Sequence, residues 1–459
     1  MIRKRYRTAT LVAAGALLVP LAACGNADNQ ETAQAPTLPA GMTNVGVGEW
    51  SGLLGVDLAD ADPAVPQVQV KLAQAPYWDH STEKIGIDKG WFAESGITVM
   101  PEPSGEILDM DQIAPALLSG QIDVGTMVPQ IWVSSLDQGV TARVFTSRDI
   151  FMGHAFLASP QMQAKSVEQL MAEGMSWNDA LTTAMAQLKG QTVYVTDEAS
   201  PRSFRKVALE SAGMTDADFT SNVLDDTTMQ QLAISGRADF VAPASGPNIV
   251  TLISKGWVPI VSTRDIVEHG DAEQLLTVIV NTGLAAELKW LQENPETAMR
   301  LAGVQYRILD FKHTDPAGAA AVQIPFINSI AGTSFTLDDA KTLDERIDPF
   351  YTFDQQSEFF EDQSSPVYWS KPLDATIASL KADGLITGDH QASDVSWSDA
   401  TWQTLKSLRE KASTEIEGLE AAGSLSEKST TQLEQAKQFL AARNYYDAYR
   451  FANAAQLNK

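Results

Sequence analysis

The sequence predicts an α/β protein with two similar lobes, a hinge between them and a helical extension at the C-terminus. From Pro66 onward, short apolar runs rich in β-branched residues alternate with longer helical patterns, as they do where helices connect the strands of a largely parallel sheet. A helix, a glycine turn and a buried strand follow one another twice, at 118–125 and at 234–240, which indicates two units of similar construction. After residue 350, apolar residues recur every three or four positions, which is typical of amphipathic helices.

Each expected element follows from its local pattern. Apolar β-rich runs bounded by turn residues predict strands at 68–73, 97–100, 124–127, 143–146, 155–158, 192–196, 238–242 and 258–262. Helical periodicity predicts helices that include 110–118, 203–212 and 229–234. The stretch 284–309 is predicted to be helical with an interruption at Asn294-Pro295, because proline fits the first turn of a new helix. The tail is predicted to be a helical hairpin with Gly423-Ser424 at its turn, which either packs on the body or docks a partner.

The first 23 residues have the composition of an export signal. A basic head at 3–7 precedes an apolar stretch at 9–19, which is short for a membrane-spanning helix. Leu21-Ala22-Ala23-Cys24 follows and resembles the lipobox of bacterial lipoproteins, in which cleavage occurs before a cysteine that carries lipid. We therefore expect a lipoprotein signal peptide at 1–23, a lipid on Cys24, and a tether and N-terminal extension at 24–65, of which 45–58 is apolar enough to pack on the body. An ordinary signal peptide with an incidental cysteine is the alternative.

Composition and missing motifs narrow the function. The 459 residues include 33 Lys and Arg against 58 Asp and Glu, a formal net charge of -25, so we expect no nucleic-acid partner. Cys24 is the only cysteine in the chain, which excludes an intramolecular disulfide and a cysteine-ligated metal cluster. The histidines lack metal-ligand spacing, and the common hydrolase, metalloprotease, phosphate-loop and dinucleotide motifs do not occur. We expect a protein that is not an enzyme and needs neither metal nor cofactor.

Several short motifs, in this order, resemble those of type 2 periplasmic substrate-binding proteins. They are Trp78-Asp79-His80, IDKGWFAESGITV at 87–99, SGQIDVG at 119–125, LKGQTVYV at 188–195 and ASPRSF at 199–204. The resemblance covers 66–345 and concerns the branch that serves ABC importers of nitrate, alkanesulfonates, taurine and thiamine precursors. The chain departs from that family in having Ala199-Ser200 in place of the usual Gly-Ser, a longer connection at 162–186 and the added tail.

The resemblance implies a two-lobed type 2 periplasmic-binding-protein fold with a hinge. Lobe 1 would comprise 66–154 and, after the chain returns, 263–349, while lobe 2 would comprise 155–262. The C-terminal helical extension, 350–459, would follow as a separate region. The hinge would lie in crossing segments near 145–158 and 258–280. The implied function is the capture of a small organic solute between the lobes and its delivery to an ABC transporter permease. We expect a monomer that is exported and held on the outer face of the cell membrane through Cys24.

Loops that follow strands supply the candidate ligand-binding residues, because ligands of open α/β sheets bind beyond the carboxyl ends of the strands. In the first loop, Trp78 offers an apolar wall, Asp79 a carboxylate and His80 a titratable donor. Their alternative roles are a core residue, a helix cap and an exposed side chain. Thr126 and Met127 end a buried strand before a proline that suits the start of a helix, where N–H groups are free to bind an oxygen.

The remaining candidates come from the second half of the expected binding region. Ser200, Arg202 and Ser203 lie at the start of a helix, which Ser200 is expected to cap in any case, and Arg202 either contacts the ligand or pairs with a nearby glutamate. Asp226 and Ser245 follow further strands. Carboxylates beside an aromatic ring favour an amine or a zwitterion, whereas an arginine favours a sulfonate or carboxylate, so the charge of the solute stays open.

Two other functions fit the same sequence. One is an enzyme on the same fold that resembles the thiamine-pyrimidine synthases, against which export from the cytoplasm counts. The other is an adaptor or sensor without a ligand, which would use its acidic surface and C-terminal hairpin to bind a neighbouring protein. A cleft lined by Trp78, Asp79 and Ser200 would count against the adaptor.

Overall fold

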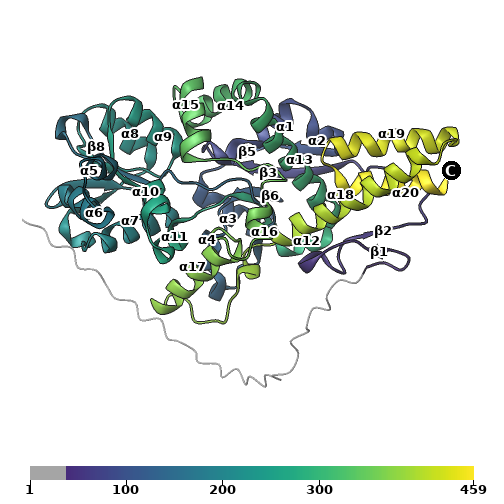
Figure 1. Ribbon diagram of the computed structural model, residues 1–459, viewed down its shortest axis with the longest axis horizontal. Coiled ribbons are helices and arrows are strands. Elements are labelled where there is room, and N and C mark those ends of the chain that lie inside the picture. The colour runs from purple at the N-terminus through teal and green to yellow at the C-terminus, as the bar shows by residue number, and fades with distance from the viewer. Residues whose placement is uncertain (1–37) are drawn as a thin grey trace, which may run out of the picture. The chain divides into compact units, whose positions relative to one another are not determined.

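Two β-sheets with the same strand arrangement organise the chain (Figure 1). The computed structural model describes residues 38–459, apart from the side chains of Ala199, Ala272, Glu273 and Thr277. The first sheet has the order β4 (Ile97–Met100), β3 (Val68–Gln74), β6 (Val124–Met127), β13 (Gly283–Glu287), β7 (Ala142–Val144), with β5 (Glu106–Ile107) also on β3. The second has the order β10 (Thr220–Val223), β9 (Thr192–Val195), β11 (Phe240–Ala242), β8 (Ala155–Ala158), β12 (Val258–Ser262). We call the sheets, with the helices that cover them, lobe 1 and lobe 2.

In each sheet, the first strand after the chain crosses from the other lobe is antiparallel to both of its neighbours. β8 is the first strand after the chain leaves lobe 1, and it pairs antiparallel with both β11 and β12. β13 is the first strand after the chain returns, and it pairs antiparallel with both β6 and β7. The strands β3, β4 and β6 of lobe 1, and β9, β10 and β11 of lobe 2, are parallel within each set. The predicted α/β fold with two similar lobes is confirmed.

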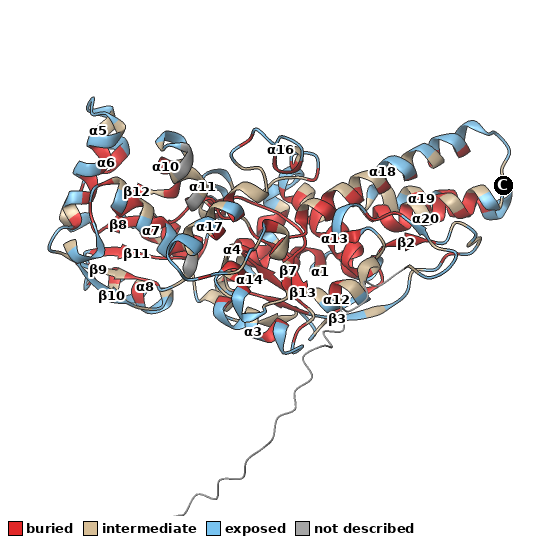
Figure 2. Cartoon of the chain, turned by 90° about the horizontal axis from the view of Figure 1, so that it is seen from below, coloured by how far each residue is buried: buried red, intermediate tan, exposed pale blue. Residues whose placement is uncertain are grey.

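Both sheets are buried on both faces because their side chains alternate between two hydrophobic layers. In lobe 1, Leu284 and Ala286 of β13 belong to one cluster and Ala285 to the other. In lobe 2, Phe156 and Ala158 of β8 face α5 (Val167–Ala172), α6 (Trp177–Met185) and α7 (Ala199–Ser211). Ala155 and Leu157 face α8 (Asp226–Ile234) and α9 (Gly246–Ser254). Figure 2 shows buried residues in the central strands of the sheets and exposed residues on the outer helices, and β10 is an exposed edge strand.

The repeated sequence pattern occupies equivalent places in the two lobes. In lobe 1, α3 (Met110–Leu118) ends at Gly120, which has a φ of 71°, and the chain continues into β6. In lobe 2, α8 ends at Gly236, which has a φ of 70°, and the chain continues into β11. A positive φ favours glycine, so the two glycines allow the same sharp turn from a helix into a buried strand.

The prediction of a helix from residue 284 is wrong, since 283–287 forms strand β13 in the middle of the lobe 1 sheet. Leucine, alanine and glutamate favour helices in isolation, but a strand that lies between β6 and β7 gains backbone hydrogen bonds on both sides. Helix α12 (Leu288–Glu293) begins directly after the strand, and Pro295 starts α13 (Pro295–Thr314) as predicted. Strand β5 was not predicted, and β10 was expected only as a strand of unstated bounds before Asp226; they are short or exposed edge strands.

The remaining helices surround lobe 1 and the connections between the lobes. They are α1 (Glu83–Asp88), α2 (Trp91–Glu94), α4 (Gln130–Val133), α10 (Thr263–His269), α11 (Ala272–Val278), α14 (Pro316–Ala331), α15 (Leu337–Thr342), a π-helical turn at Leu343–Ile347, α16 (Ser357–Phe360) and α17 (Ser370–Ala382). α17 packs on α4 of lobe 1 and on α11. Asp383, at the C-terminal end of α17, forms an ion pair with Lys206 of α7 in lobe 2. The segment after α16 therefore touches both lobes.

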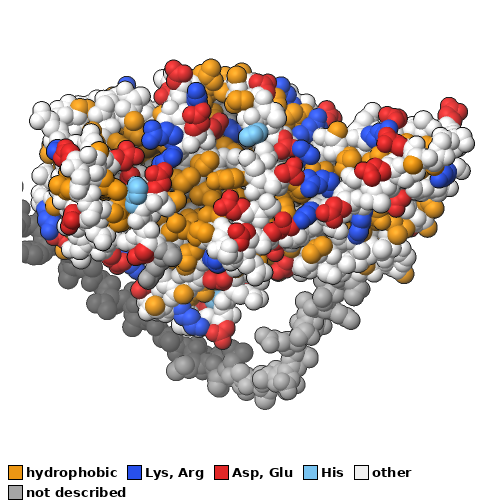
Figure 3. Space-filling model, in the orientation of Figure 1, with side chains coloured by type: hydrophobic (Ala, Val, Ile, Leu, Met, Phe, Trp, Pro, Cys, Tyr) orange, Lys and Arg blue, Asp and Glu red, His pale blue; other side chains and the backbone are white. Residues whose placement is uncertain are grey.

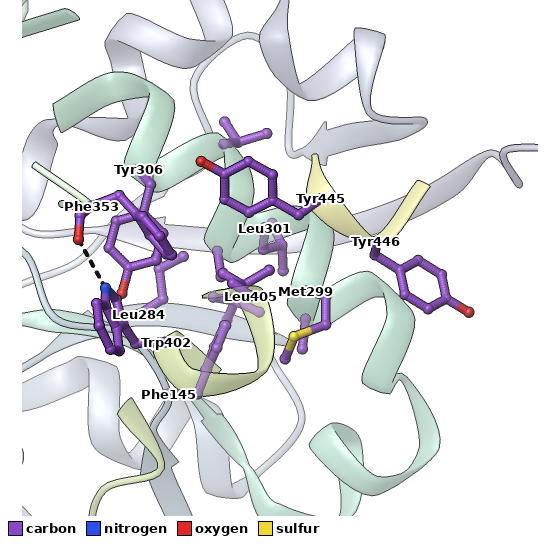
Figure 4. Close-up of a cluster of buried hydrophobic side chains, with 14 of the residues drawn as sticks. Phe145, Leu284, Met299, Leu301, Tyr306, Phe353, Trp402, Leu405, Tyr445 and Tyr446 are labelled. Atoms are coloured by element: carbon purple, nitrogen blue, oxygen red, sulfur yellow. Dashed lines mark hydrogen bonds between the residues drawn. The ribbon is translucent and has the colours of Figure 1, made fainter. Parts of the chain in front are cut away.

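After α17, the C-terminal extension continues with three helices, where the sequence predicted a two-helix hairpin: α18 (Ser398–Ala421), α19 (Glu427–Ala441) and α20 (Tyr445–Leu457). The short pair of strands β1 (Thr43–Asn44) and β2 (Gly55–Val56) packs against it, because the Trp50 indole donates a hydrogen bond of 2.8 Å to Thr401 and the Tyr446 hydroxyl one of 3.0 Å to the Gly55 carbonyl. Figure 4 shows side chains of α18 and α20 in one cluster with Phe145 and Leu284 of lobe 1.

Two expectations for the N-terminal region concern the membrane. Cys24 and the predicted signal at 1–23 lie outside the residues that the structure describes. Within 38–459, no helix combines the length and the apolar composition that crossing a bilayer would require.

Candidate functional site

Three segments lie side by side where the chain passes between the lobes. The first crossing runs from β7 to β8, the second ends just before β13, and a third segment returns after the π-helical turn. Backbone hydrogen bonds join Phe151 to Val280 across the two crossings at 2.8 Å, and Tyr351 of the third segment to Arg148 of the first at 2.9 Å. A rotation of one lobe against the other would pivot at these segments, because the chain passes between the lobes here.

A cavity lies between the lobes next to this hinge. Its lining comes from the β3–α1 loop and α3–α4 of lobe 1, from the start of α7 and the β11–α9 loop of lobe 2, and from both crossings. The space open to the centres of water molecules is about 40 Å³, enough for about three waters or one small solute. The lining residues are Tyr77, Asp79, His80, Met110, Val128, Ile131, Phe151, His154, Glu198, Ser200, Pro201, Ala244, Gly246, Val280 and Thr282. On the face drawn in Figure 3, hydrophobic side chains gather near the middle of the view, where the two lobes meet.

A hydrogen bond across the cavity connects the two lobes directly. The Tyr77 hydroxyl of lobe 1 donates to Glu198 Oε1 of lobe 2 at a distance of 2.8 Å. Burial raises the pKa of Glu198 to about 7, although the bond from Tyr77 opposes the increase by stabilising the carboxylate. Burial and the neighbouring Glu198 charge also raise the pKa of Tyr77 well above its usual value, so the phenol keeps its proton as donor. Glu198 is thus a carboxyl group whose charge changes near neutral pH.

Asp79 and His80 form the wall of the cavity on the lobe 1 side. His80 Nδ1 lies 2.9 Å from the Thr126 hydroxyl and His80 Nε2 lies 3.2 Å from Asp79 Oδ2. Burial and the charge of Arg148 lower the pKa of His80 to about 4, so its imidazole is neutral at pH 7. Burial raises the pKa of Asp79 to about 6 against the opposing attraction of Arg148. The wall therefore presents hydrogen-bonding groups that carry little positive charge.

His154 lies in the first crossing and offers two further hydrogen-bonding atoms. Its side chain is buried, and neither ring nitrogen has a hydrogen-bond partner among the described residues. The ring packs edge-on against Phe151, with centroids 4.7 Å apart. Burial lowers its pKa to about 3, so the imidazole is neutral and offers one donor and one acceptor. A buried polar ring without a partner beside a cavity is a natural contact for a solute.

Behind the wall, a buried arginine holds the loop that carries Asp79. The Arg148 side chain is fully buried, and its guanidinium lies 2.9 Å from Glu83 Oε1. It also donates to the Asp79 carbonyl at 2.7 Å and to the Thr82 hydroxyl at 2.8 Å. The arginine of the first crossing therefore fixes the loop of lobe 1 from which the site is built.

The structure brings three of the predicted site residues, Asp79, His80 and Ser200, into the cavity lining. Trp78 points away from it: the indole packs on Phe335 and donates to Asp344 at 2.6 Å. The others also lie outside the lining. Thr126 forms a hydrogen bond with His80, and Met127 lies in the lobe 1 core. Arg202 is exposed and pairs with Asp197, and Ser203 is exposed. Asp226 accepts hydrogen bonds from the backbone N–H groups of Ala244 and Ser245.

Sequence reasoning missed four polar residues of the lining, which are Tyr77, His154, Glu198 and Thr282. Tyr77 directly precedes the predicted Trp78, and Glu198 lies in the loop just before the predicted Ser200. The sequence therefore located the two loops but not the side chains that face the cavity. His154 lies at the end of the first crossing, immediately before β8. The one sequence pattern that could have indicated His154 as a lining residue is a histidine in a predicted hinge segment, directly before an apolar strand.

No protein-family model and no curated protein sequence matches the chain. Among solved structures, the periplasmic nitrate-binding protein NrtA from Synechocystis PCC 6803 is similar, with 15% identity and a TM-score of 0.51 over 74% of this chain and 89% of NrtA. The periplasmic aliphatic sulphonate-binding protein SsuA from Escherichia coli is similar with 12% identity and a TM-score of 0.50 over 72% of this chain and 92% of SsuA. At these identities the similarity establishes the fold, and the chain has the two-lobed periplasmic-binding-protein fold.

Proposed function

We propose that the protein is an exported solute-binding protein that encloses a small amine between its lobes and delivers it to the permease of an ABC importer. The observation that carries the proposal is the cavity lined by both lobes and by both crossing segments. A solute there contacts groups that come together only when the lobes close, so its binding energy favours the closed form. The fold, shared with periplasmic nitrate- and sulphonate-binding proteins, supports the same role. An adaptor without a ligand has no use for such a cavity.

The charges of the lining favour an amine over an anion. The cavity lining contains Asp79 and Glu198 but no lysine or arginine among the described residues. A buried nitrate or sulfonate without a cationic partner pays a large desolvation cost, whereas an ammonium group can donate charge-assisted hydrogen bonds to carboxylates. Tyr77 and Phe151 supply ring surfaces next to these carboxylates, and the neutral His154 can bind a second polar atom of the solute. The small free volume limits the solute to a few heavy atoms in this closed form.

Calorimetry with the purified protein tests the proposal directly. The panel comprises short primary amines, small zwitterions, nitrate, short alkanesulfonates and pyrimidines. We expect saturable binding of a primary amine and none of nitrate or the sulfonates. Preferential binding of an anion would overturn the assignment of solute class but leave the solute-binding role intact. Absence of binding across the panel, with no change in the thermal midpoint, would overturn the role itself.

Glu198→Gln is expected to weaken binding of the amine by about 10- to 100-fold, because a charge-assisted hydrogen bond is worth about 1.5–3 kcal/mol. The same carboxylate should give binding a pH dependence. Since burial raises its pKa to about 7, Glu198 is increasingly protonated in the free protein below that pH, and the amine must displace the proton. Affinity should therefore fall as the pH is lowered from 8 to 6, approaching tenfold per unit.

The neighbouring Asp197→Asn is the matched control for this variant. Asp197 is exposed and pairs with Arg202 at the surface, so its loss should change the affinity by less than about twofold. Calorimetry of both variants at several pH values makes the comparison. If Glu198→Gln keeps the wild-type affinity and pH profile, the ammonium group does not lie against Glu198.

Lipid attachment at Cys24 is a separate part of the proposal, supported by the lipobox-like sequence. In a host that processes lipoproteins, Cys24→Ser is expected to move the protein from the membrane fraction to the soluble exported fraction, because the thiol that would carry the lipid is lost. Metabolic labelling with a fatty acid is the direct readout. Labelling that persists in Cys24→Ser would contradict the assignment.

A further inference from the structure

Three buried aspartates come together at the hinge, and one of them, Asp79, also lines the solute cavity. Asp79 comes from the β3–α1 loop, Asp149 from the first crossing and Asp348 from the third segment. Each offers a carboxylate oxygen, and these oxygens all lie within 4.8 Å of one another. All three side chains are buried. Three carboxylates so close together in the interior repel one another strongly unless something positive lies between them.

The Asp348 side chain gives separate evidence for a bound ligand. The residue is 0% exposed, and neither of its carboxylate oxygens has a hydrogen-bond partner among the described residues. Asp149, by contrast, accepts bonds from the backbone N–H and the hydroxyl of Thr282 at 2.7 and 2.9 Å. A buried carboxylate with no donor for either oxygen is costly, and in native proteins such a group has an unseen partner.

The nearby arginine does not meet this need. The Arg148 guanidinium is occupied by Glu83, by the backbone carbonyl of Asp79 and by the side chains of Thr82 and Gln305. Because Arg148 already pairs with Glu83, none of the three aspartates has an ion pair of its own with a lysine or arginine among the described residues. His80 contacts Asp79 but carries no charge at pH 7.

We infer that Asp79, Asp149 and Asp348 bind one divalent cation, and that Ca²⁺ is the ion they suit. The donors are all oxygens, which hard cations prefer, and they include no nitrogen or sulfur ligand that would favour zinc or copper. Calcium binds oxygens at about 2.3–2.6 Å, so two ligands on opposite sides of one ion lie about 4.6–5.2 Å apart. The aspartate oxygens all lie within 4.8 Å of one another, so no two of them are farther apart than two ligands of one calcium ion can be. Three carboxylates can supply up to about six of the 6–8 oxygens that calcium takes.

The position of the site gives the ion a structural consequence. Each ligand lies on a different segment of the hinge, and Asp149 also holds Thr282 just before β13. A bound ion would therefore join the loop of lobe 1, the first crossing and the third segment at the place where the lobes pivot. Asp79 and Thr282 also line the cavity, which gives a hydrated ion a route to the site. The inference does not depend on the identity of the solute or on transport.

Calcium titration of the purified protein, stripped with EDTA and kept free of solute, tests the inference. We expect one Ca²⁺ per chain by calorimetry, and a thermal midpoint about 3–5 °C higher at a calcium concentration 100 times the dissociation constant. Mg²⁺ at the same concentration should give a smaller increase, because it demands shorter distances and stricter octahedral geometry. A flat titration together with an unchanged midpoint for both ions would overturn the inference.

Asp348→Asn distinguishes a metal site from a site that merely holds protons. The variant should lose the calcium-dependent increase in the midpoint, and in EDTA at pH 8 it should be more stable than the wild type, because one of three repelling charges is gone. Asp354→Asn is the matched control: Asp354 is exposed and pairs with Arg409, so calcium should still stabilise that variant. If wild type and Asp348→Asn respond to calcium equally, the aspartates do not bind it. If only pH changes the wild-type midpoint, with stability lost as the pH rises, the cluster holds protons and the inference is wrong.

Discussion

Replacing Arg148 with methionine is expected to lower the free energy of unfolding by about 3–5 kcal/mol, or to prevent folding altogether. The side chain is fully buried and pairs with Glu83, which is itself 1% exposed. Methionine preserves much of the volume, so the loss reflects the charge and its hydrogen bonds rather than a cavity. Without the guanidinium, Glu83 is left as an uncompensated buried charge beside Asp79 and Asp149. Urea unfolding followed by tryptophan fluorescence measures the change.

Two further variants isolate the cause of this loss. Arg202→Met removes an exposed arginine that pairs with Asp197, and it should change stability by less than about 1 kcal/mol. The double variant Arg148→Met/Glu83→Gln should recover part of the loss, because both members of the buried pair are then uncharged. If Arg148→Met is no less stable than Arg202→Met, the arginine does not hold the hinge loop as described.

Local sequence patterns were sufficient for the strands that begin and end at clear turns. β6, β8 and β12 are mostly apolar, and β3 alternates polar with apolar residues, so the local pattern of each strand agrees with its place in a sheet. β13 could not be predicted in this way. Its alanines and leucine suit a helix, and it is a strand because the chain returns from lobe 2 into a space between β6 and β7. That space depends on residues more than a hundred positions away.

The candidate site shows the same division between local and distant causes. The loop that holds Asp79 and His80 follows a strand, and sequence reasoning found it for that reason. Residues far along the chain determine which side chain of the loop faces the cavity. Trp78 points away from the cavity because its ring packs on Phe335 and its indole N–H donates a hydrogen bond to Asp344. The space beside His80 is filled by Tyr77, which reaches Glu198 of the other lobe.

Contacts between distant segments also explain why no sequence pattern predicted the aspartate cluster. Asp79, Asp149 and Asp348 have no common motif and no metal-ligand spacing. They meet because the third segment pairs along the first crossing, with an isolated bridge between Asp149 and Phe350. The expectation of no metal followed from motif spacing alone, and spacing in sequence cannot reveal ligands that three separate segments supply.

Trp402→Ala should be the most damaging single truncation in the C-terminal extension, with an expected loss of about 3–5 kcal/mol in the free energy of unfolding. The Trp402 side chain is 2% exposed, stacks on Phe353 with ring centroids 5.5 Å apart, and donates to the Phe353 carbonyl at 2.9 Å (Figure 4). Truncation would remove a large buried aromatic surface and leave a cavity between α18 and the third segment. Urea and thermal unfolding measure the loss.

Leu457→Ala in α20 is the matched control, because Leu457 is 50% exposed and its truncation should cost less than about 0.5 kcal/mol. The shape of the unfolding curve carries further information. Trp402, Leu405 and Tyr445 share one hydrophobic cluster with Leu72, Val124 and Leu284 of the lobe 1 sheet. The extension should therefore unfold together with lobe 1, and Trp402→Ala should shift that whole transition to lower urea. A separate early transition for the extension, with lobe 1 unaffected, would show that the tail is an appendage rather than a part of the lobe 1 core.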